Sequence, residues 1–198
     1  MLKTNTQSSS RGFTIVELIV VIVVIAILAS ITVVAFNGIQ GKAKSARLIA
    51  AVDAYTKIIN MYMLDHNGDV PSTGATFACL GYGYVETSVF SEGACLKLSG
   101  YAVPPFGDSI NDELAKYSNL PSVADAEFHQ AGADVRGLLY GGSNGAYGKS
   151  ASILYYIDGD QTCARGEKMG YKADGSDAGP GDVVAMTTCN VKIVDVVY

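Results

Sequence analysis

The chain has 198 residues, of which 49% are hydrophobic, and it carries a net charge of −5 at pH 7. After His66 the sequence holds sixteen acidic residues against eight basic ones. Because such a surface repels phosphate, we expect no general affinity of the isolated chain for nucleic acid or for anionic lipid headgroups.

The first predicted element is a long apolar helix that begins beside a single carboxylate, Glu17. Nineteen uncharged residues follow it, Leu18 to Phe36. In a helix these residues span about 28 Å, close to the ~30 Å hydrocarbon core of a bilayer. A carboxylate at mid-membrane is unfavourable by about 2.5–3.5 kcal/mol, so Glu17 needs a role or a partner. Thr14 and Glu17 also have the spacing of a capping box, which would start the helix.

Two ordinary targeting segments are alternatives for the same run. A secretory signal would use Leu18 to Leu28 as its apolar core and be cleaved near Ala29, although the run continues beyond that length. A plain signal anchor would give Glu17 no role at all. The N-terminus of the mature chain distinguishes these alternatives.

One motif spans the start of the run and reads Gly12, Phe13, Thr14, Ile15, Val16, Glu17, Leu18, Ile19. It resembles the processing site of type IV prepilins and pseudopilins, and the resemblance extends from residue 11 to about residue 66. It implies a leader of residues 1–12, cleavage by a prepilin peptidase between Gly12 and Phe13, and methylation of Phe13. It also implies that Glu17 guides assembly. The new ammonium on Phe13, from the same or a neighbouring chain, would attract Glu17 by about 4 kcal/mol at an effective dielectric of 20.

The helix is expected to continue past the apolar run, because no proline occurs before Pro71. Gly38 and Gly41 are the weak points, and any bend or local melting of the helix is expected there. We divide the helix, residues 13–66, into a transmembrane and assembly half, 13–37, and an amphipathic half, 38–66. Apolar residues at helical spacing predict that the second half packs on the chain's own globular domain; they are Leu48, Val52, Tyr55, Ile59 and Tyr62.

The opposite flank of this second half is expected to be solvated. Asp53 and Lys57 lie four residues apart there, a spacing at which opposite charges pair on a helix surface.

A turn at Asn67–Pro71 is expected to end the helix, with Gly68 in a left-handed conformation. Residues 67–198 then form a globular head. Its first part, 67–150, is predicted to be irregular, with a short helix near Ser109–Tyr117 and mostly loop between Gly137 and Gly148. Its last part, 151–198, is predicted to be antiparallel sheet with three strands; they are Ser152–Ile157, Val183–Thr188 and Val191–Tyr198. The predicted fold is therefore α+β and pilin-like, a long N-terminal helix packed against a C-terminal antiparallel β-sheet.

Four cysteines lie in the part of the chain expected to be exported, where thiols are oxidised. Of the three possible connectivities we expect the sequential one, Cys79–Cys95 and Cys163–Cys189. A zinc site is the alternative, but none of the four forms a CxxC pair.

The sequence offers no convincing enzyme signature, so we expect no catalytic residues and no cofactor. His66 beside Asp65 and Asp69 is interpreted as a solvated histidine at a helix end rather than a metal ligand. Calcium is the one alternative left open, because acidic residues cluster near two turns; its candidate ligands are Asp158, Asp160, Asp174 and Asp177.

The resemblance implies a structural subunit of a type IV pilus-like surface filament. The chain would be a single-pass precursor in the inner or cytoplasmic membrane and then part of a homo-oligomeric helical filament at the cell surface. Its implied partners are the prepilin peptidase, the pilus assembly platform and minor pilins. A pseudopilin of a type II secretion or DNA-uptake machine is one alternative, and a membrane-tethered extracellular binding module is another.

Overall fold

The computed structural model describes residues 14–73, 77–98, 101–102, 108–130, 133–145, 148–159, 161–169 and 186–194. The chain divides into two compact units, Met1–Gly41 and Lys42–Tyr198. The leader, Gly12 and Phe13 lie outside the described residues.

The first element is the helix α1, Ile15–Asp65. It carries no break in secondary structure at Gly38 or Gly41. The expected long N-terminal helix is therefore present, because no proline interrupts these 51 residues.

The end of α1 is fixed by backbone geometry that the sequence predicted. Asn67 and Gly68 both have positive φ, 53° and 81°. The amide of Gly68 donates to the carbonyl of Met63 at 2.7 Å, and the amide of Asp69 donates to His66 at 3.0 Å. These bonds satisfy carbonyls that the last helical turn leaves open.

The head contains a second helix and two antiparallel sheets. The helix α2, Asp108–Ala115, lies where a short helix was expected. The strands are β1 Ala78–Leu80, β2 Leu96–Leu98, β3 Tyr101–Ala102, β4 Glu127–Gln130, β5 Ala133–Arg136, β6 Leu138–Gly145, β7 Gly148–Asp158, β8 Glu167–Met169 and β9 Met186–Val194. The larger sheet has the order β1-β6-β7-β9-β8, and the smaller one has the order β3-β2-β5-β4.

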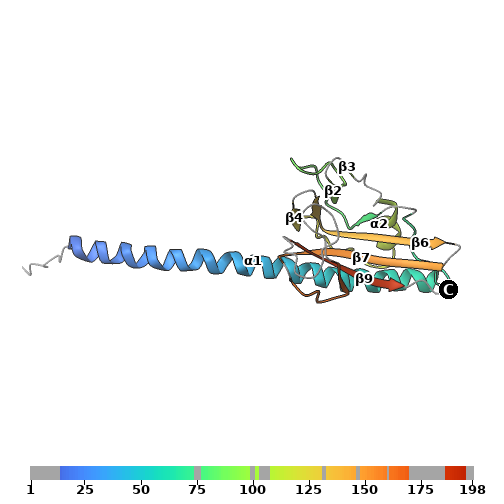
Figure 1. Cartoon of the computed structure of the whole chain (residues 1–198), viewed down its shortest axis with the longest axis horizontal. Helices are drawn as coiled ribbons and strands as arrows, with labels where there is room; N and C mark the ends of the chain where they lie inside the picture. The colour runs from blue at the N-terminus through green and yellow to red at the C-terminus, as the bar shows by residue number, and fades with distance from the viewer. Residues whose placement is uncertain are drawn as a thin grey trace, which may run out of the picture. The chain divides into compact units, whose positions relative to one another are not determined.

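The core of the head lies between the second half of α1 and the larger sheet, as Figure 1 shows with β6, β7 and β9 beside that half. Val52, Tyr55 and Ile59 are fully buried there. Alternate residues of β7 belong to the same core, since side chains of a strand alternate between its faces; they are Ala151, Ile153, Tyr155 and Ile157. The predicted α+β fold is confirmed.

The expectation of a loop between Gly137 and Gly148 was wrong, because β6 occupies most of this stretch and pairs with β7 over seven registered positions. Close packing requires one of these glycines, Gly142. A Cβ on Gly142 would clash with the carbonyl of Pro71 and the hydroxyl of Tyr140. Glycine in a strand often marks such a close approach of the backbone. The many glycines between Gly137 and Gly148 therefore did not indicate a loop.

Two further expectations about strands need correction. The smaller sheet lies in the part expected to be irregular, and its strands, of two to four residues each, are too short to show a periodic pattern. The expected strands Val183–Thr188 and Val191–Tyr198 are one strand where the structure describes them, β9. Cys189 and Asn190 continue that strand by pairing with Tyr155 and Leu154 of β7.

Candidate functional site

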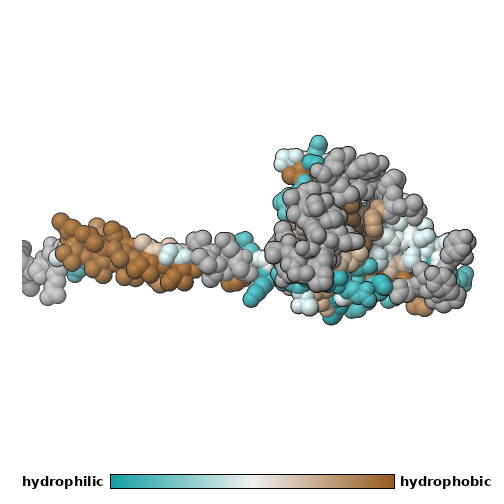
Figure 2. Space-filling model, in the orientation of Figure 1, coloured by the Kyte–Doolittle hydropathy of each residue, from teal (hydrophilic) through white to brown (hydrophobic). Residues whose placement is uncertain are grey.

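The first half of α1 presents an apolar surface of membrane length. The segment Ile15–Thr32 has a mean hydropathy of 3.0 and none of it is buried. Its large aliphatic side chains are about half exposed or more, from 48% at Val21 to 79% at Ile15. Figure 2 shows this segment as an almost uninterrupted hydrophobic surface. Such a surface is stable in lipid or against other apolar helices, and not in water.

Glu17 lies in the first turn of this helix and forms the predicted capping box with Thr14. The Thr14 amide and hydroxyl donate to Oε2 of Glu17 at 2.8 and 2.7 Å, and the Glu17 amide donates to the Thr14 hydroxyl at 3.2 Å. Among the described residues, Oε1 receives no hydrogen bond. A carboxylate can accept up to about four hydrogen bonds, so Glu17 retains capacity for a further donor.

Two disulfides reinforce the head. Cys79 on β1 is bonded to Cys95, which directly precedes β2, with Cα atoms 5.7 Å apart. Cys163 is bonded to Cys189 on β9 at the same Cα separation. The connectivity in the structure is therefore the sequential one. Each bond closes a loop, of 16 and 26 residues in sequence separation, and restricts the unfolded chain.

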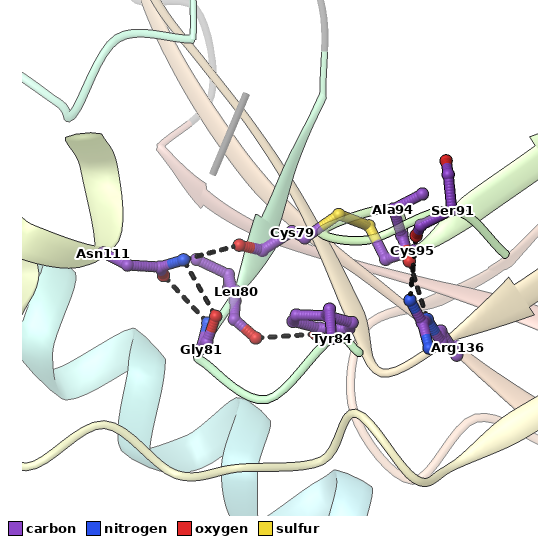
Figure 3. The surroundings of a disulfide bond; sticks show 9 residues. All are labelled: Cys79, Leu80, Gly81, Tyr84, Ser91, Ala94, Cys95, Asn111 and Arg136. Carbon is purple, nitrogen blue, oxygen red and sulfur yellow. Dashed lines mark hydrogen bonds between the residues drawn. A yellow bond between two sulfur atoms is a disulfide. The ribbon is translucent and has the colours of Figure 1, made fainter. Parts of the chain in front are cut away.

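A buried arginine that sequence analysis missed organises the first of these loops (Figure 3). Arg136 on β5 is 1% exposed. Its Nε donates to the carbonyl of Ala94 at 2.6 Å, and its two terminal nitrogens donate to Val85 at 2.8 Å and Ser91 at 3.3 Å. Burial lowers the pKa of Arg136. The sequence carries no signal of this burial, because a charge next to an apolar residue is also the ordinary pattern of a strand with one solvated face.

Asn111 of α2 fixes the other end of this loop. Its side chain accepts from the amide of Gly81 at 2.8 Å and donates to the carbonyls of Cys79 at 3.0 Å and Gly81 at 2.9 Å. The hydroxyl of Tyr84 donates to the Leu80 carbonyl at 2.8 Å. The loop is thus irregular in conformation and is tied to its surroundings by hydrogen bonds at both of its ends (Figure 3).

Two ion pairs that the sequence did not predict attach the second half of α1 to the head. Arg47 donates to both carboxylate oxygens of Asp125 at 2.8 Å. Arg165 donates to those of Asp53 at 2.8 and 3.2 Å. These hydrogen bonds hold the pKa of Asp125 and of Asp53 below the ordinary value of a carboxyl group.

The expectation that Asp53 pairs with Lys57 was therefore wrong, because Asp53 pairs with Arg165. Arg165 lies 112 residues away in sequence and takes both oxygens of Asp53. Lys57 contributes only a weaker charge interaction that also lowers the pKa of Asp53. A planar guanidinium matches a carboxylate in two hydrogen bonds, which a lysine cannot do.

Side chains that could bind a metal ion are not grouped together in the described part of the chain. Within the described residues, no group of three or more His, Cys, Asp or Glu side chains is placed to hold a metal ion. His66 instead stacks on Tyr62, with ring centroids 3.8 Å apart. Of the four calcium candidates, Asp160, Asp174 and Asp177 lie outside the described residues, and only the backbone of Asp158 is described.

Comparison with known proteins points to the same N-terminal region. A family model described as the prokaryotic N-terminal methylation motif matches residues 7–33. A curated relative, the type II secretion system core protein G of Klebsiella michiganensis, is 39% identical over 67 residues. The match covers 34% of this chain and 46% of the relative. No solved structure matches the chain.

The methylation motif, the similarity to a secretion-system core protein, and a capped apolar helix that leads into an antiparallel-sheet head all agree. In this N-terminal region the chain is similar to type IV pilins and pseudopilins.

Proposed function

We propose that the chain is a structural subunit of a type IV pilus-like filament. The observation that carries this proposal is the apolar segment Ile15–Thr32, of which none is buried within the chain. Outside a bilayer this surface needs to be covered, and the corresponding helices of other copies have the same apolar character. A contact between two different patches on successive copies produces an open helical filament unless its rotation closes a ring.

Processing precedes assembly in this proposal. Residues 1–12 act as the leader, a prepilin peptidase cleaves between Gly12 and Phe13, and Phe13 is methylated. Before assembly the chain is a single-pass membrane protein, and afterwards it is part of a filament at the cell surface. The assembly platform and minor pilins are its expected partners, and the chain itself carries out no reaction.

Glu17 is proposed as the residue that guides assembly. Its Oε2 is used by Thr14 within the same chain, which leaves Oε1 for the ammonium group of Phe13 on a neighbouring copy. A buried carboxylate is tolerated where such a counter-charge meets it.

Substitution of Glu17 tests this assignment. We expect Glu17→Ala to be processed normally, with a methylated Phe13 at its N-terminus by peptide mass spectrometry, and to yield few or no sheared filaments by electron microscopy. Thr14→Ala is the matched control, because it removes the capping partner and keeps the carboxylate. A Glu17→Ala chain that polymerises at full yield would contradict the role of Glu17, and a mature N-terminus near Ser30 would contradict the processing route.

A pseudopilin is the second candidate, and it is favoured by the identity of the curated relative, a core protein of a type II secretion system. Long fibres that contain this chain as the main component favour a pilus. Short or absent fibres favour a pseudopilin.

A further inference from the structure

The loop between β1 and β2 is irregular yet rigidly held, and this combination suggests a contact surface. Cys79–Cys95 closes it, Asn111 holds its start, and Arg136 holds three of its carbonyls. Burying an arginine is unfavourable unless its donors are all used. A loop fixed in this way loses little conformational entropy when a partner binds, which favours recognition.

The outer side of this loop combines apolar side chains with a carboxylate. Tyr82 is 45% exposed and Val85 is 65% exposed. With Glu92, which is also exposed, they line an open hollow of about 220 Å³. The hydroxyl of Tyr82 is held by Asp112 at 2.8 Å, so this ring has a defined position. We call this surface the loop hollow.

The last turns of α1 carry a second apolar surface of opposite charge. Lys57, Met61 and Leu64 recur at helical spacing, so they share one face. At about 100° per residue this face points away from the one that places Tyr55 and Ile59 in the core. Leu64 is 86% exposed and Met61 is 39% exposed. Asp53, one turn before Lys57, is bound by Arg165, and the Lys57 side chain is exposed. We call this surface the helix-end face.

We propose that the helix-end face of one copy docks on the loop hollow of the next copy. Met61 and Leu64 then cover Tyr82 and Val85, and Lys57 pairs with Glu92. The occupant is a second copy because one compact unit, Lys42–Tyr198, carries both halves of a matched pair. Each half has two apolar side chains and one charge, and the two charges are of opposite sign. Two copies of an acidic chain repel one another in general, so an oppositely charged pair at the contact fixes their register.

This docking rests on the proposed filament function and adds to it a specific contact between heads. The two surfaces differ, so the contact is head-to-tail and propagates along a filament.

Disulfide cross-linking tests the contact directly. All four native cysteines are already paired, so introduced thiols are the only free ones. In sheared filaments of the double variant Leu64→Cys/Val85→Cys, oxidation is expected to give a ladder of multimers on non-reducing gels. Each single variant is expected to give no ladder beyond dimers. Leu64→Cys/Glu167→Cys is the control, with its second thiol at another exposed position of the head.

A charge exchange tests the polar part of the contact. Lys57→Glu and Glu92→Lys are each expected to lower the filament yield by about tenfold, because like charges then meet across the contact. The double variant is expected to return the yield to within about twofold of the original, since the opposite pair is restored. All of these side chains are exposed, so the fold is retained, and unchanged urea unfolding verifies this.

The outcomes separate this docking from the filament function. If the original chain forms filaments while the double-cysteine variant gives no ladder and the charge exchange restores nothing, the docking is overturned and the filament function stands. If the original chain forms no filament in cells with the assembly machinery, both are overturned. A ladder together with rescue by the charge exchange establishes the contact.

Discussion

Gly141 and Gly142 are neighbours in β6, yet the space around them differs. A Cβ on Gly141 would lie 3.1 Å from the ring of Phe77, which is 42% exposed and can move aside. A Cβ on Gly142 would clash with the carbonyl of Pro71 and the hydroxyl of Tyr140. That hydroxyl donates a hydrogen bond to the same carbonyl, so neither group is free to move aside. One position tolerates a methyl group and the other does not.

We therefore expect Gly142→Ala to lower the free energy of unfolding by about 2 kcal/mol, as overpacking of a core does. Gly141→Ala is the matched control and is expected to change it by less than about 1 kcal/mol, because a flexible ring can adjust. Urea unfolding of the full chain in detergent measures both, followed by tyrosine fluorescence, since the chain has 12 tyrosines and no tryptophan. Equal losses in the two variants would contradict the crowding argument.

At the scale of elements, the second half of α1 is joined to the head by its apolar face and by two ion pairs. Arg47–Asp125 and Arg165–Asp53 connect the helix to residues 78 and 112 positions away. The side chains are 40% to 65% exposed, so solvent screens each pair and its contribution to stability at neutral pH is small.

These pairs predict a dependence of stability on acid. The pKa of Asp53 and of Asp125 is lowered in the folded chain. Their stabilisation is therefore present above the ordinary pKa of aspartate, about 3.9, and is lost as the pH falls through the lower folded value. We expect the double variant Asp53→Asn/Asp125→Asn to be less stable at pH 7 and to lose less stability than the original chain on acidification to pH 2.

Urea unfolding at a series of pH values measures this difference. Glu113→Gln is the control, because Glu113 pairs with Lys116 only three residues away and does not connect the helix to the head. Parallel pH profiles for the double variant and the original chain would refute the assigned role of the two pairs.

At the scale of the whole molecule, the chain combines a head that buries its own core with a segment that buries nothing. Ile15–Thr32 has no buried residue, whereas the head contains a continuous core from Leu48 to Cys189. One part is stable in water and the other requires lipid or another apolar surface.

A charge placed within the apolar segment should therefore affect membrane retention and leave the head unchanged. Val24→Asp is expected to raise the insertion free energy by about 2.5–3.5 kcal/mol and to shift the chain from the membrane to the soluble or aggregated fraction. Ala43→Asp, at an exposed position in the head's part of α1, is the control and is expected to remain in the membrane. Fractionation after alkaline carbonate extraction gives the readout, and full membrane retention of Val24→Asp would contradict the expectation.

The sequence by itself determined the helix, its end and the similarity of its N-terminal region to pilins and pseudopilins, because these depend on local signals. A run without charge or proline, the Thr14–Glu17 cap and the Asn67–Gly68 turn each act within a few residues, and short-range patterns can be read from the order of residues. The sequential disulfide pairing was predicted in a similar way, because it joins cysteines that are neighbours in sequence.

Only the tertiary structure decided which residues meet across long separations. In the folded chain Arg136 donates hydrogen bonds to the loop, and Asp53 pairs with Arg165 instead of Lys57. The stretch with Gly141 and Gly142 forms a strand. Each of these depends on what the folded chain brings within a few ångströms, and neither propensity nor spacing carries that information.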